Sequence, residues 1–117
     1  MDSAVGDKSK KFAIRIVRLY QYLSEEKREY VMSKQILRAG TSIGANVREA
    51  LDGQSRADFT AKMSIALKEA VETEYWLELL FETDYLKEEE YVSIQGDCKE
   101  LARMLTSIVK TSRVNRT

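Results

Sequence analysis

Small and apolar residues recur at alternating steps of four and three along the third quarter of the chain. They are Phe59, Met63, Ala66, Ala70, Thr73, Leu77 and Leu80. This spacing returns to one face of an α-helix over three heptads, and such a face needs an equally long apolar partner. With no proline and only five glycines in 117 residues, little interrupts long helices. The pattern therefore predicts helices packed side by side and disfavours a strand-and-turn fold.

Three further segments carry comparable stripes. They are residues 8–26 (Phe12, Ile16, Leu19, Tyr20, Leu23), 33–51 (Ile36, Ile43, Val47, Leu51) and 88–112 (Tyr91, Ile94, Cys98, Leu101, Leu105, Ile108). Ser33 and Ser55 are candidate N-caps for the second and third helices. The short connections force neighbouring helices to run antiparallel. The sequence thus predicts an all-α, up-down-up-down antiparallel four-helix bundle over residues 8–112, with a disordered N-terminus (1–7) and a loose tail (113–117). The alternative is an extended pair of hairpins that completes its core only by dimerising.

Two glycines stand on the second helix where larger side chains would be expected. Small residues at Gly40 and Gly44 let a neighbouring backbone come close. This spacing is a membrane dimerisation motif only inside an apolar span, and no run of about 18 apolar residues exists. The first seven residues also lack the apolar core of a signal peptide. We therefore expect a cytoplasmic protein with no membrane partner.

The chain has no histidine and one cysteine, which restricts its chemistry. Histidine is the commonest general base and the commonest transition-metal ligand. Glu49, Glu69 and Glu72 could converge, but di-iron bundles use Glu-x-x-His pairs and no calcium loop is recognisable. Cys98 lies at a core position, where a thiol fills space. We predict a non-enzymatic protein with no catalytic residue, no metal, no cofactor and no small-molecule substrate.

Charge is unevenly distributed although the net charge is zero. Residues 8–56 contain eleven Lys/Arg against five Asp/Glu, and residues 57–97 contain three against eleven. Solvated helix faces, a basic side that meets the acidic side of a second copy, and a phosphate-binding surface are all consistent with this pattern. If the first two helices are adjacent, seven cations form one basic strip, the candidate nucleic-acid-binding residues: Lys10, Lys11, Arg15, Arg18, Lys34, Arg38 and Arg48. No aromatic residues interleave with this strip.

The segment 35–50 resembles the four-helix bundle proteins encoded by intervening sequences of 23S ribosomal RNA genes. The matching residues are Gln35, Arg38-Ala39, Ser42-Ile43, Ala45-Asn46 and Glu49. The similarity continues through Asp58-Phe59, Ile65-Ala66, Glu72 and Tyr75-Trp76-Leu77, and spans roughly residues 12–108. Two departures are Ala50, where the family usually has glycine, and Glu69-Ala70, where many relatives have a small residue and serine.

The resemblance implies a closed bundle that assembles into a homopentamer. It also relates the chain to the accessory variability determinant protein of diversity-generating retroelements, a basic pentameric barrel that associates with nucleic acid and a reverse transcriptase. We therefore predict a non-enzymatic, oligomeric bundle that binds RNA or DNA through a basic face. The alternative is a protein–protein interaction scaffold with no nucleic-acid role.

Overall fold

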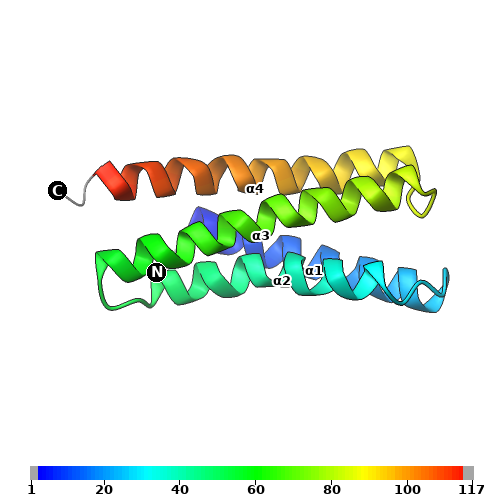
Figure 1. The fold of residues 1–117 in the computed structure, drawn as a ribbon, viewed down its shortest axis with the longest axis horizontal. Coiled ribbons are helices and arrows are strands. Elements are labelled where there is room, and N and C mark those ends of the chain that lie inside the picture. Colours follow the sequence, from blue (N-terminus) through cyan, green and yellow to red (C-terminus); the bar gives the residue numbers. More distant parts are fainter. Residues whose placement is uncertain (1–2, 115–117) are drawn as a thin grey trace.

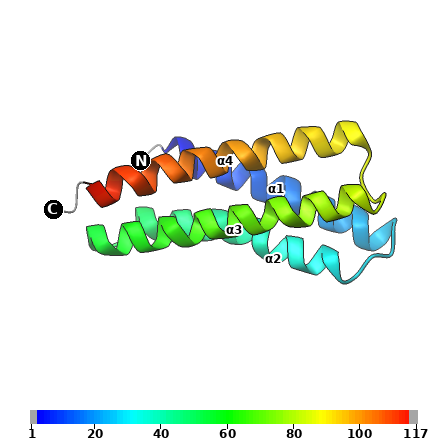
Figure 2. The same cartoon turned by 45° about the horizontal axis from the view of Figure 1, so that its top comes forward.

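The computed structural model describes residues 3–114, which form four helices and no strand. The helices are α1 (Ala4–Glu25), α2 (Met32–Leu51), α3 (Arg56–Glu82) and α4 (Glu88–Val114), and they lie side by side (Figure 1). Within this part of the chain the backbone of α1 lies close to those of α2 and α4, and the backbone of α3 also lies close to those of α2 and α4, whereas the backbones of α1 and α3, and of α2 and α4, stay apart. Those two pairs are therefore the diagonals of a four-helix bundle, and the predicted fold class is confirmed (Figure 2).

The first helix begins earlier than its apolar stripe indicates. The Oγ of Ser3 accepts a hydrogen bond from the backbone N–H of Gly6 at 3.0 Å, which caps the helix at Ala4. Residues 4–7, expected to be disordered, form the first turn of α1, and Val5 is buried there. The last helix also continues past Ser112 to Val114. Residues 1–2 and 115–117 of the expected loose ends lie outside the described residues.

The second helix is capped by a carboxylate and not by Ser33, so the sequence prediction was wrong here. The Glu29 carboxylate accepts hydrogen bonds from the backbone N–H groups of Val31, Met32 and Ser33 at 3.2, 3.1 and 2.7 Å. Ser33 lies buried inside the helix, and its Oγ donates to the Glu29 carbonyl. Partial desolvation raises the pKa of Glu29, but the hydrogen bonds outweigh it and hold the pKa below its usual value.

We predict that Glu29→Gln lowers the free energy of unfolding at pH 7 by about 0.5–2 kcal/mol, the range for loss of a helix cap. Because the folded-state pKa is depressed, the carboxylate stabilises the fold above its unfolded-state pKa, and this advantage is lost as the pH falls through the folded-state value. Urea unfolding between pH 7 and 3 should show the two proteins converging at low pH. Glu26→Gln is the control, because Glu26 is exposed and lies in the same connection between α1 and α2. A difference in the free energy of unfolding between wild type and Glu29→Gln that stays constant at every pH would contradict the role of Glu29 as a cap.

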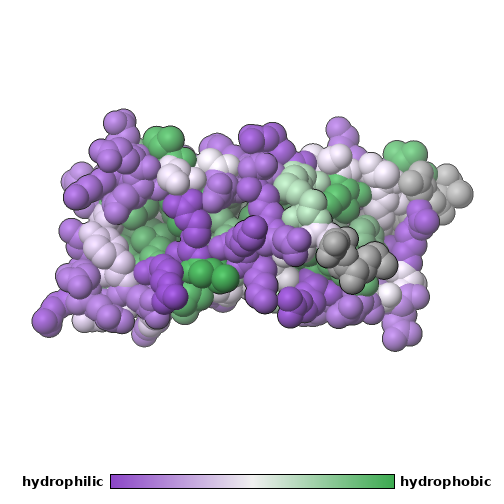
Figure 3. All heavy atoms as spheres, turned by 180° about the vertical axis from the view of Figure 1, so that it is seen from behind, coloured by the Kyte–Doolittle hydropathy of each residue, from purple (hydrophilic) through white to green (hydrophobic). Residues whose placement is uncertain are grey.

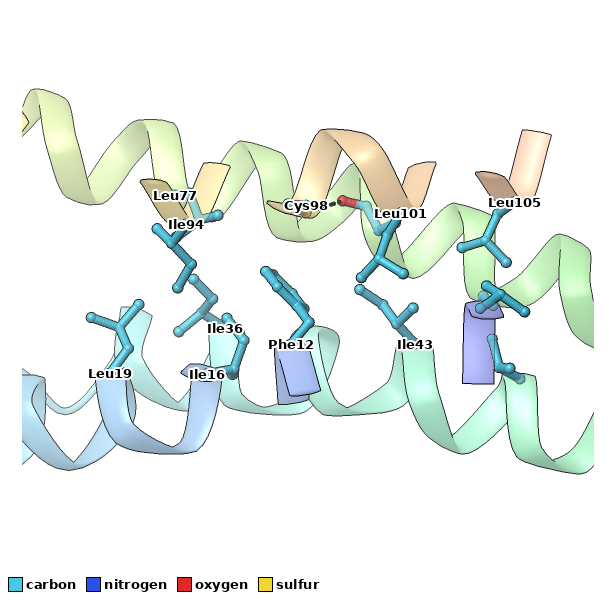
Figure 4. Packing of buried hydrophobic residues seen from close by; sticks show 14 of the residues in the cluster. Phe12, Ile16, Leu19, Ile36, Ile43, Leu77, Ile94, Cys98, Leu101 and Leu105 are labelled. Carbon is cyan, nitrogen blue, oxygen red and sulfur yellow. Dashed lines mark hydrogen bonds between the residues drawn. The ribbon is translucent and has the colours of Figure 1, made fainter. Parts of the chain in front are cut away.

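The core runs along the bundle axis and takes side chains from all four helices (Figure 4). The predicted positions in α3 are buried apart from Phe59, which is partly buried. In α4 the stripe continues through Val109 and Ser112, with Ile108 only partly buried beside it. Leu51, predicted as core, is 46% exposed because it is the last residue of its helix. The spacing of apolar residues thus predicts correctly which side of each helix faces the core, and the predictions become less accurate toward the helix ends.

The α1–α2 contact is unusually close at Gly40. A Cβ on this residue would lie 2.7 and 2.8 Å from the two γ-carbons of Ile16, well inside van der Waals contact. One turn later, a Cβ on Gly44 would lie 3.3 Å from the carbonyl oxygen of Ser9. The expected close approach of a neighbouring backbone is therefore confirmed, and the neighbour is α1.

Candidate nucleic-acid interface

Most of the predicted basic strip is exposed and unpaired. Among residues 3–114, Lys10, Lys11, Lys34 and Arg48 form no ion pair and their residues are exposed. Arg18 is exposed as well and donates a hydrogen bond to the Oε1 of Gln21, one turn further along α1. These five cations can therefore meet an external anion without breaking a bridge inside the bundle.

Arg15 joins α1 to α4. Its guanidinium donates to Asp97 at 2.7 Å and to the Oγ of Ser93 at 3.1 Å. Lys8 extends the same seam with a 2.7 Å contact to Glu100. The α1–α4 pair is the most sparsely packed of the four neighbouring pairs, so these polar bridges stand where apolar contact is thin. Arg15 thus has a structural partner already.

Arg38 faces the other flank, toward α3. It contacts Glu69 at 3.3 Å and Glu72 at 2.6 Å, and Glu72 also accepts a hydrogen bond from the indole Nε1 of Trp76 at 3.1 Å. The Trp76 hydrogen bond and the Arg38 guanidinium lower the pKa of Glu72 despite partial desolvation, and the same Glu72 contact raises the pKa of Arg38. The Tyr75 ring packs edge-on against Trp76.

Among the other residues that match the family, Glu49 contacts α3, Ser42 and Asn46 hydrogen-bond to the backbone of α2, and Gln35 faces solvent. Ser42 donates to the Arg38 carbonyl at 2.6 Å, and Asn46 donates to the Ser42 carbonyl at 2.8 Å. Glu49 contacts Lys62 of α3 at 3.0 Å, and Gln35 is exposed. Arg38 and Glu49 of the motif therefore bridge α2 to α3, and Glu49, Glu69 and Glu72 each pair with a cation.

The seven predicted cations do not form one continuous strip. Arg15 turns toward α4 and Arg38 toward α3, so they lie on opposite flanks of the α1–α2 hairpin. Between these flanks, Lys10 and Arg48 line a shallow hollow whose other lining residues include Gly44 and Ala45, and also Asp7 and Asp52. The hollow itself is of mixed charge, so the positive character belongs to the hairpin as a whole.

Charge separates between the two hairpins of the bundle. Helices α1 and α2 carry eight Lys/Arg against three Asp/Glu, whereas α3 and α4 carry seven against eleven. Because sequential helices pack together, one side of the bundle is basic and the other acidic.

Sequence reasoning missed Lys8, Asp97 and Glu100 as partners at the α1–α4 seam. The i, i+3 spacing of the two acids was the signal in the sequence that could have located them.

Over residues 3–114 no three acidic or cysteine side chains come close enough to hold a metal ion. Cys98 is fully buried, and its thiol donates to the Ala70 carbonyl at 3.4 Å. None of the four described helices is long and apolar enough to cross a bilayer.

Comparisons with known proteins place the chain in a family. The model of the 23S rRNA-intervening sequence protein family matches residues 1–107. A solved structure, a protein with unknown function from the S23 ribosomal protein family of Bacteroides thetaiotaomicron VPI-5482, is 62% identical with a TM-score of 0.89; the match covers 91% of this chain and 95% of that one. No curated protein matches. With the family model spanning most of the chain, this protein belongs to the 23S rRNA-intervening sequence protein family.

Proposed function

We propose that this protein is a non-enzymatic, homo-oligomeric bundle that binds structured RNA or DNA through the basic α1–α2 hairpin. The observation that supports this most directly is the charge separation between the hairpins, with eight cations against three acids on α1 and α2. A basic surface attracts the phosphate backbone because each phosphate contact releases condensed counterions. The family resemblance supports a homopentamer, whose copies would multiply the weak contacts of one hairpin.

Ion pairing within the bundle narrows the set of cations that we propose to contact nucleic acid. Arg15 and Arg38 are engaged in ion pairs within the bundle, so we leave them out. Lys10, Lys34 and Arg48 are exposed and make no ion pair within residues 3–114. Lys10 and Arg48 line the hollow between α1 and α2, and Lys34 lies in the first turn of α2. These three residues are the ones expected to contact phosphate most directly, and Lys11 and Arg18 contribute to the positive field.

We predict that the triple change Lys10→Gln, Lys34→Gln and Arg48→Gln weakens binding of a structured RNA hairpin or a DNA duplex more than about tenfold at ~50 mM salt. The slope of log K against log salt should fall by about 3, one for each lost phosphate contact. The matched control is Lys87→Gln, Arg103→Gln and Lys110→Gln, which removes three exposed cations from the other hairpin. Fluorescence anisotropy over a salt series measures both quantities.

Two results would overturn this function. The first is no association of the wild-type protein with either nucleic acid at ~50 mM salt, where phosphate contacts are strongest. The second is an equal loss of affinity in the control variant, which would show that net charge and not the α1–α2 surface decides binding. Charge reversal at Arg15 is a poor test, because it would break the ion pair with Asp97 inside the bundle.

An interaction scaffold without a nucleic-acid role is the second candidate. It is favoured by apolar side chains that α3 leaves exposed, among them Ile65, Val71 and Tyr75. A stable oligomer that binds neither RNA nor DNA would support this candidate over the first.

A further inference from the structure

An open hollow lies where the α2–α3 connection and the start of α3 meet the last turns of α4 (Figure 1). This α3–α4 hollow has a volume of about 650 Å³, which is within the range of roughly 300–1,000 Å³ typical of ligand sites. Its apolar side is formed by Phe59 and Ile108, which are both partly buried. The polar residues that line it include Gln54, Ser55, Ser107 and Thr111. An aromatic residue therefore lies beside amide and hydroxyl groups, which can both donate and accept hydrogen bonds.

Hydrogen bonds fix the two walls of the α3–α4 hollow relative to each other. The hydroxyls of Thr60 on α3 and Ser112 on α4 are bonded to each other, and both residues are buried. Thr60 also donates to the carbonyl of Arg56 at 3.0 Å, so Ser112 is the donor in the hydroxyl pair. Ser55 caps α3 by accepting from the backbone N–H of Asp58 at 3.1 Å. The hollow is thus formed before any ligand arrives, so binding does not have to order its walls.

The α3–α4 hollow adjoins the surface that we propose to hold phosphate. Lys10 and Arg48 line the hollow between α1 and α2, and the lining of that hollow extends to Asp52 in the α2–α3 connection. The next residue, Gly53, lines the α3–α4 hollow. A strand whose phosphates lie on Lys10 and Arg48 can therefore continue directly into the second hollow.

The end of the bundle with the α2–α3 connection is also the basic end. This half, residues 3–13, 44–68 and 100–114, contains ten Lys/Arg against five Asp/Glu, whereas residues 14–43 and 69–99 contain eight against thirteen. Ion pairs leave the excess in place, because Lys8 and Lys62 pair with Glu100 and Glu49 of the same half. Figure 3 shows the α1 side of the bundle, where polar side chains cover most of the surface. An anionic strand is therefore attracted to the end at which the α3–α4 hollow opens.

We propose that the α3–α4 hollow binds one unpaired nucleobase of an RNA or DNA strand whose phosphates lie on the α1–α2 hairpin. This inference rests on the proposed function and adds a site for a base to the surface for phosphate. The base packs on Phe59 and Ile108, and its polar edge meets Gln54, Ser107 and Thr111. A base inside a duplex cannot enter, because its faces are stacked and its edge is paired. The protein therefore prefers strands with loops, bulges or unpaired ends over a fully paired duplex.

Two substitutions at the α3–α4 hollow test this preference by fluorescence anisotropy at ~50 mM salt, where phosphate contacts are strong. The probes are an RNA hairpin with an unpaired loop and a blunt RNA duplex with the same number of phosphates. Wild type should bind the hairpin about 5- to 150-fold more tightly, the range for stacking of one base. Phe59→Leu removes the flat ring but keeps an apolar side chain, and Ser107→Leu places a larger side chain in the hollow from an exposed position. Both changes should bring the affinity for the hairpin down to that for the duplex.

Thr106→Leu is the matched control, because Thr106 is exposed on α4 next to Ser107 and lies outside the α3–α4 hollow. This variant should keep the wild-type preference, and urea unfolding confirms that all three variants fold. Neither substitution at the hollow removes a cation, so duplex affinity and the salt slope should both stay at their wild-type values.

The outcomes separate the base site from the phosphate surface. Wild-type binding of the hairpin that is no tighter than binding of the duplex would overturn the base site and leave the proposed function standing. An unchanged preference in Phe59→Leu or in Ser107→Leu would do the same. No binding of either probe by the wild-type protein would overturn the proposed function and the base site with it.

Discussion

Gly40→Ala is expected to lower the free energy of unfolding by about 1–3 kcal/mol, although alanine is the better helix former by about 1 kcal/mol. The added methyl would lie 2.7 and 2.8 Å from the γ-carbons of Ile16. Both atoms are attached to the Cβ of a β-branched side chain with no exposed surface, so Ile16 cannot turn aside without disturbing its neighbours. The α1 and α2 backbones must move apart, which loosens the core contacts around Gly40.

Gly96→Ala is the matched control, and we expect it to change the free energy of unfolding in the opposite direction. Gly96 lies in the middle of α4, and a Cβ there would meet nothing within 4 Å. Only the higher helix propensity of alanine changes the stability there, so this substitution should raise the free energy of unfolding by up to about 1 kcal/mol. Urea unfolding of both variants measures the difference. Equal stabilisation by the two substitutions would show that the α1–α2 contact tolerates a wider spacing and that Gly40 has no packing role.

The sequence predicted the close contact at Gly40 but not its partner. A glycine pair in a helical stripe indicates a close neighbour, and only the tertiary structure shows that Ile16 fills the space. The cap of α2 was missed for a related reason. A serine before an apolar run predicts an N-cap, whereas here Glu29, a residue outside the helix, takes three backbone N–H groups. The chain between α1 and α2 must turn before that carboxylate can reach them.

The candidate interface was predictable as a region and not in its details. Counting charges along the chain located the basic α1–α2 hairpin, because sequential helices joined by short loops pack together. The apolar period fixes which side of a helix points inward, but it does not fix which flank meets which neighbour. For this reason Arg15 and Arg38 were grouped with the free cations, although α4 and α3 supply them with carboxylates.

Cys98 is expected to react with iodoacetamide at pH 8 at least about a thousandfold more slowly than an exposed cysteine. Burial, with a smaller contribution from Glu74, raises the pKa of the thiol from 9.0 to about 12, and the thiolate is the reactive form. The raised pKa also means that the contribution of Cys98 to the free energy of unfolding is constant below about pH 9 and falls as the pH rises toward 12, because the thiol of the unfolded chain ionises first. The measurement is mass-spectrometric labelling, with Ser107→Cys in a Cys98→Ala background as the exposed reference.

Because Cys98 is the only cysteine, its labelling rate also reports how the bundle opens. The thiol bonds to Ala70 between α3 and α4, away from Gly40 in sequence and helix. If opening of the whole bundle exposes it, labelling follows the unfolding equilibrium. Gly40→Ala should then accelerate labelling about 5- to 150-fold, which corresponds to 1–3 kcal/mol, and Gly96→Ala should slow it up to about fivefold. Unchanged rates in both variants would show that α4 separates locally, along the sparsely packed α1–α4 seam, without unfolding of α1 and α2.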